Sequence, residues 1–95
     1  MNKLTQQQIS KIESSMIAYG FGGSVTEYGA SLDSSGYQKL GARVEIYVGE
    51  KYGAGLSVEM GHSSMGGKTI AEAEASVKTL IKGIKLAKKI KGILR

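Results

Sequence analysis

Residues 40–60 have the sequence LGARVEIYVGEKYGAGLSVEM, and this stretch decides the fold class. Its first half alternates with a period of two, which is typical of a half-buried strand. One side of that strand carries Leu40, Ala42, Val44, Ile46 and Val48, and the other carries Arg43, Glu45 and Tyr47. The pattern returns at Leu56, Val58 and Met60, and residues 49–53, with glycines at 49 and 53, supply the turn between the two runs. The stretch therefore predicts an antiparallel β-hairpin.

A helix is expected on each side of this hairpin. Thr5 and Gln8 form a capping box, and apolar residues at helical spacing then predict a helix from about Gln6 to Tyr19. Thr69 and Glu72 form a second capping box before a longer helix. The apolar face expected to be buried in that longer helix consists of Ile70, Ala73, Val77, Leu80, Ile81 and Ile84.

A weaker strand, residues 24–32, precedes the hairpin, with Tyr28, Ala30 and Leu32 expected to point inward. The sequence thus predicts a two-layer α+β domain of order α-β-β-β-α. Its three-stranded antiparallel sheet would carry the N- and C-terminal helices on one face. The expected core is Ile9, Ile12, Met16, Leu40, Val44, Ile46, Val48, Leu56, Val58, Ile70, Val77, Leu80 and Ile81.

Composition limits the classes of function. The 95 residues fit one domain, 1–95, and contain no cysteine, so neither disulfides nor thiolate metal sites can form. His62 is the only histidine and the acids are scattered, so we expect no catalytic residues, no metal site and no cofactor. No apolar run reaches about 18 residues, so no membrane-spanning helix is expected, and a cytoplasmic location is the default.

Positive charge is concentrated at one end of the sequence. Residues 78–95 carry seven positive charges and no acid, whereas residues 1–77 sum to −2 because the whole chain carries +5. After Gly83 the apolar residues Leu86, Ile90 and Ile93 lie on a different side of the helix from the earlier set. This rotation indicates either that the helix breaks near Gly83 and Gly92 or that its last turns pack on something else. In both cases a basic helical extension at about 84–95 is expected, with those three residues as candidates for a partner interface.

Such a basic segment attracts polyanions, and we expect a non-enzymatic module that binds the backbone of RNA or DNA. The residues expected to bind are Lys68, Lys78, Lys82, Lys85, Lys88, Lys89, Lys91 and Arg95. The alternatives are lysines that serve solubility only, an acidic protein surface as the partner, and a membrane-surface helix. Arg43 and Tyr47 on the outer strand face are further candidates for a partner interface, and exposed sheet edges would permit a homodimer.

The element order resembles the double-stranded RNA-binding domain over residues 5–84. Residues 42–55, ARVEIYVGEKYGAG, are similar to that family's central hairpin, and residues 67–75, GKTIAEAEA, to the start of its second helix. The resemblance implies an RNA-binding fold in which Lys68 contacts phosphates. In general character the chain also resembles small phage-encoded proteins that block a bacterial defence system, anti-CRISPR proteins among them. That resemblance implies an inhibitor that binds a host protein.

Overall fold

The computed structural model describes residues 3–34, 43–50, 55–63 and 69–95. Along the chain the elements are α1 (Gln6–Ala18), β1 (Gly22–Thr26), β2 (Gly29–Asp33), β3 (Arg43–Glu50), β4 (Leu56–Ser63) and α2 (Ile70–Ile93). The strands form an antiparallel sheet in the order β1-β2-β3-β4. The α+β class with a helix at each end is confirmed. The sheet already has four strands within the described residues, so the prediction of three was wrong.

The additional strand arises where one long strand was expected over residues 24–32. Thr26 pairs with Gly29, so a tight turn at Glu27 and Tyr28 divides the segment into β1 and β2. Gly29 has a φ of 151°, and a Cβ added there would lie 2.0 Å from the carbonyl oxygen of Val48, so only glycine fits this position. The turn leaves Tyr28 60% exposed, which corrects its expected place in the core.

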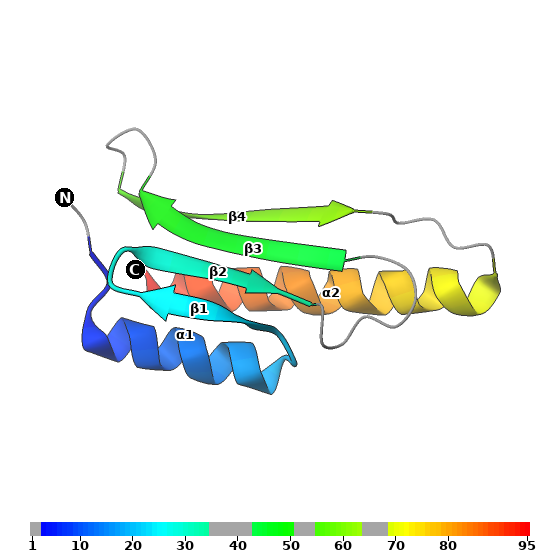
Figure 1. Cartoon of the computed structure of the whole chain (residues 1–95), viewed down its shortest axis with the longest axis horizontal. Helices are drawn as coiled ribbons and strands as arrows, with labels where there is room; N and C mark the ends of the chain where they lie inside the picture. The colour runs from blue at the N-terminus through cyan, green and yellow to red at the C-terminus, as the bar shows by residue number, and fades with distance from the viewer. Residues whose placement is uncertain (1–2, 35–42, 51–54, 64–68) are drawn as a thin grey trace.

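Both helices pack on the same face of the sheet, with α1 under β1 and α2 under β3 and β4 (Figure 1). α1 and α2 also contact each other. The alternation predicted for β3 is confirmed, because its inward residues are buried and Tyr47 between them is exposed. The fully or nearly buried core residues are Leu4, Ile12, Phe21, Leu32, Val44, Ile46, Val48, Leu86, Ala87 and Ile90.

The predicted helix starts are confirmed. Thr5 caps α1 with the complete box, since its side chain accepts from the Gln8 amide and the Gln8 side chain accepts from its backbone. Thr69 caps α2 by accepting from the Glu72 amide at 3.2 Å. α2 then continues without a break to Ile93. Of the two alternatives at Gly83, a break is therefore not found, and the last turns continue the same helix.

Gly83 is buried on the side of α2 that packs against β3. A Cβ built on it would lie 2.6 Å from Cγ1 of Val44. The missing side chain therefore lets the helix backbone approach the sheet. The glycine that the pattern indicated as a helix breaker is instead a packing contact, because a helical glycine costs only about 1 kcal/mol relative to alanine.

The face of α2 that packs inward is not the face that hydrophobicity indicates. Its buried residues are Ser76, Thr79, Gly83, Leu86, Ala87 and Ile90. By contrast Ile70, Val77 and Ile81 are 79%, 50% and 45% exposed, so their assignment to the core was wrong, and Ile84 on the same face is 38% exposed. Of the other predicted core residues, Ile12, Val44, Ile46 and Val48 are buried and Ile9, Met16, Leu56, Val58 and Leu80 pack partly buried against them. Leu40 lies outside the described residues.

Candidate functional site

Helix α2 carries four lysines on one side, which we call the lysine row: Lys78, Lys82, Lys85 and Lys89. Their spacing of four, three and four residues keeps them within an arc of about 60° at 100° per residue. The row is about 16 Å long at 1.5 Å per residue. All four side chains are exposed. Because the helix is unbroken between them, the charges stand on one rigid support.

The row ends in a hollow between the two helices, of about 300 Å³. Lys89 of α2 and Lys11 of α1 line it together with the serines 10 and 14. A hydrogen bond from Nε2 of Gln8 to the carbonyl oxygen of Ile93, at 3.4 Å, ties the helices together nearby. Two ammonium groups and two hydroxyls at one hollow are donors suited to an anionic oxygen. Lys11 belongs to this surface and was missed in the sequence, because only the fold brings residues 11 and 89 together.

The remaining positive charges of the C-terminal segment do not join the row. Lys88 and Lys91 are exposed, but they lie about 90° and about 150° around α2 from the middle of the row. Arg95 follows the end of the helix and is exposed. Lys68 lies outside the described residues. The eight predicted binding residues therefore divide into a row of four, a second group at the end of the chain, and one whose position is not described.

Leu86, Ile90 and Ile93 were expected to face a partner, and this expectation was wrong. Leu86 and Ile90 are 0% exposed in the core, and Ile93 packs partly buried against it. The reason is the packing at Gly83, which turns this side of the helix toward β3. The exposed apolar residues of α2 are the other set, Ile70, Val77, Ile81 and Ile84, which we call the apolar stripe.

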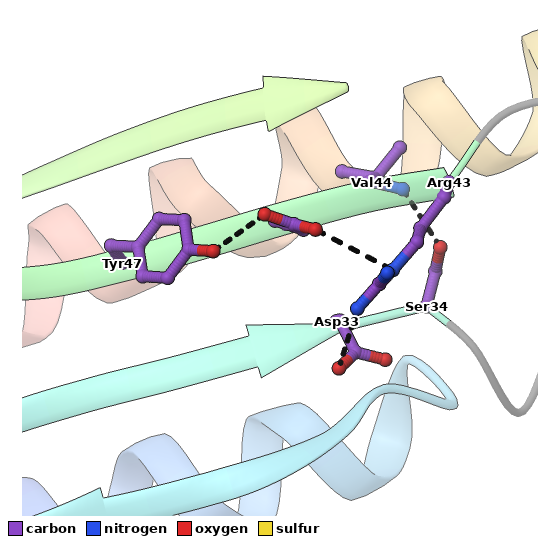
Figure 2. A network of polar contacts seen from close by, with 6 residues as sticks. Asp33, Ser34, Arg43, Val44 and Tyr47 are labelled. Carbon is purple, nitrogen blue, oxygen red and sulfur yellow. Dashed lines mark hydrogen bonds and ion pairs between the residues drawn. The ribbon is translucent and has the colours of Figure 1, made fainter. Parts of the chain in front are cut away.

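The outer face of the sheet carries Arg43 and Tyr47, and both contact acids (Figure 2). Arg43 lies 3.6 Å from a carboxylate oxygen of Asp33 and 3.5 Å from one of Glu45. The Tyr47 hydroxyl donates to the other oxygen of Glu45. This hydrogen bond is the main reason that the pKa of Tyr47 is raised above its usual 10.0. The two carboxylates offset the charge of Arg43, so this face offers less attraction to a phosphate than the lysine row does.

His62 is exposed near the end of β4, opposite Val44 in the sheet register. Within the described segments no three His, Cys, Asp or Glu side chains gather where they could hold a metal ion. No helix in the part of the chain that the structure covers is long and apolar enough to cross a membrane.

Comparison of the chain with models of protein families, with curated proteins and with solved structures finds no match in any of the three.

Proposed function

We propose that this protein is a non-enzymatic module that binds the phosphodiester backbone of RNA or DNA through the lysine row. The observation that carries the proposal is the alignment of Lys78, Lys82, Lys85 and Lys89 on one side of an unbroken helix. The hollow that Lys89 shares with Lys11 extends the row onto α1. A rigid line of ammonium groups displaces the counterions condensed on a nucleic acid, which is the main source of sequence-independent affinity.

The number of contacts sets the expected salt dependence. Five lysines, the row together with Lys11, would give a slope of log affinity against log salt of about −4.5 on duplex DNA. Affinity would then fall about 500-fold between about 50 and about 200 mM salt. Lysines that serve solubility only would produce no measurable complex at either salt concentration.

The test is fluorescence anisotropy with labelled duplex RNA and duplex DNA at both salt concentrations. The variant Lys82→Ala/Lys89→Ala removes two charges from the row. Lys91→Ala/Arg95→Ala removes the same charge from outside it and is the matched control. We expect the slope of the row variant to drop to about −2.7, with the control close to the parent. No binding by the parent at low salt would refute the proposal, and equal losses in the two variants would refute the row as the site.

A further inference from the structure

The apolar stripe is exposed because small residues occupy the inward side of α2. Ser76 and Thr79 are buried, and their hydroxyls are satisfied within the helix. Ser76 Oγ donates to the Glu72 carbonyl at 2.9 Å, and Thr79 Oγ1 donates to the Ala75 carbonyl at 3.0 Å. Because these hydroxyls are bonded within the helix and Gly83 lies against Val44, the side of α2 that carries Ser76, Thr79 and Gly83 packs closely on the sheet. The bulkier side chains of the stripe are consequently left facing outward.

The spacing of the stripe is that of a helix-packing seam. Ile70, Val77 and Ile84 follow one another at seven residues, and Ile81 fills the position between the last two. Apolar residues at alternating steps of three and four form the seam by which two helices pack side by side; Val77, Ile81 and Ile84 follow these steps, and Glu74 takes the corresponding position between Ile70 and Val77. Within the described part of this chain α1 contacts α2, but it lies on the side away from the stripe, where it shares the hollow at Lys89.

The charges along one margin of the stripe match a second copy of the same helix. Glu74 lies near the N-terminal end of the stripe and Lys85 near its C-terminal end, both exposed and on the same side. In the arrangement we consider, two α2 helices lie side by side and antiparallel, with Val77 of one at the same height along the axis as Ile81 of the other. Glu74 of the first helix is then only about 1.5 Å along the axis from Lys85 of the second. Such an antiparallel pair has a two-fold axis, so the same ion pair forms twice, once at each end of the interface. A lipid surface would instead meet the negative charge of Glu74 at the margin of the stripe.

We propose that the apolar stripe is a self-association surface, through which two copies of this chain pair their α2 helices antiparallel. The surface consists of Ile70, Val77, Ile81 and Ile84, with reciprocal ion pairs between Glu74 and Lys85. The apolar residues of this surface do not depend on nucleic-acid binding, because the middle of the stripe lies about 100° around the helix from the middle of the lysine row; Lys85 alone belongs to both surfaces. The two-fold axis leaves both rows on the same face of the dimer, side by side.

Sedimentation velocity over a range of protein concentrations tests the pairing. We expect the parent to pass reversibly from monomer to dimer in the micromolar to millimolar range. Val77→Lys places a charge in the centre of the seam and should raise the dissociation constant at least about tenfold. Ile17→Lys is the matched control, because Ile17 is 72% exposed on α1, away from the stripe, and should leave the constant within about twofold. Circular dichroism establishes that each variant is folded.

A charge exchange tests the antiparallel arrangement itself. Glu74→Lys and Lys85→Glu should each weaken the dimer by severalfold, and the double variant should recover most of the loss. Failure of the double variant to recover would overturn the antiparallel arrangement. A dimer that Val77→Lys leaves intact would assign association to another surface, such as a sheet edge. A strictly monomeric parent would also overturn the proposal, and Val77-dependent binding to phosphatidylserine vesicles would then assign the stripe to a lipid surface.

Discussion

Replacing Gly83 by alanine tests the packing that determines which side of α2 faces solvent. An alanine Cβ there would lie 2.6 Å from Cγ1 of Val44, about 0.8 Å closer than ordinary contact at 3.4 Å allows. Overpacking of this kind costs about 1–3 kcal/mol, whereas alanine gains about 1 kcal/mol over glycine in a helix. We expect the sum to destabilise the protein by about 1 kcal/mol. This loss corresponds to a fall in melting temperature of about 4–8 °C.

Gly92→Ala is the matched control, because Gly92 is on the same helix and a Cβ there meets nothing within 4 Å. The free energy of unfolding of both variants is measured in urea. Both variants gain the same helix propensity, so the difference between their free energies of unfolding reports the cost of the contact with Val44, which we expect to be about 1–3 kcal/mol. Val44→Ala removes the contacting methyl group at its own cost in core packing, and in that background the further change Gly83→Ala should stabilise the protein instead of destabilising it. If Gly83→Ala stabilises the protein as much as Gly92→Ala does, Gly83 does not pack on Val44 and the assignment of the faces of α2 fails.

Three further predictions concern other parts of the molecule. Gly29→Ala should cost at least about 2 kcal/mol in urea unfolding because of its positive φ and the Val48 carbonyl, whereas Gly22→Ala, with open space around it, should stay within about 0.5 kcal/mol. Thr5→Ala should lose about 1 kcal/mol with the cap of α1, and a change near zero would show that the box is not formed in solution. The Tyr47 pKa is raised by Glu45, so the stability from their hydrogen bond is present below pH 10.0 and is lost as the pH rises through the folded-state pKa. Glu45→Ala should lower the pH at which the Tyr47 ring signal titrates by NMR, and an unchanged titration would contradict the bond.

The sequence predicted those parts of the fold in which local chemistry and tertiary packing agree. Thr5 and Thr69 mark the helix starts because a hydroxyl at the N-cap bonds a nearby amide in any fold. The alternation around Val44 and Ile46 predicted β3 because one face of an antiparallel sheet must be covered. The turn at Tyr28 was missed because the apolar pattern continues through it, although Gly29 was a signal that could have indicated it.

The orientation of α2 could not be predicted from hydrophobicity. The pattern favours burial of Val77 and Ile81, but it does not record that Ser76 and Thr79 bond their own helix or that Gly83 permits close approach. The lysine row follows from spacing alone once the helix is known to be unbroken. The contribution of Lys11 depends on the packing of α1 against α2, and no feature of the sequence between them indicates it.

The hydrogen bond between Gln8 and Ile93 joins residues 85 positions apart. Chains are synthesised from the N-terminus at about 5–20 residues per second, so α1 leaves the ribosome several seconds before the helix that it packs against. Until Ile93 has emerged, the apolar side of α1 and the underside of the sheet lack their cover. The domain can therefore close only once residue 93 has left the ribosome, and until then the nascent chain presents those surfaces to solvent.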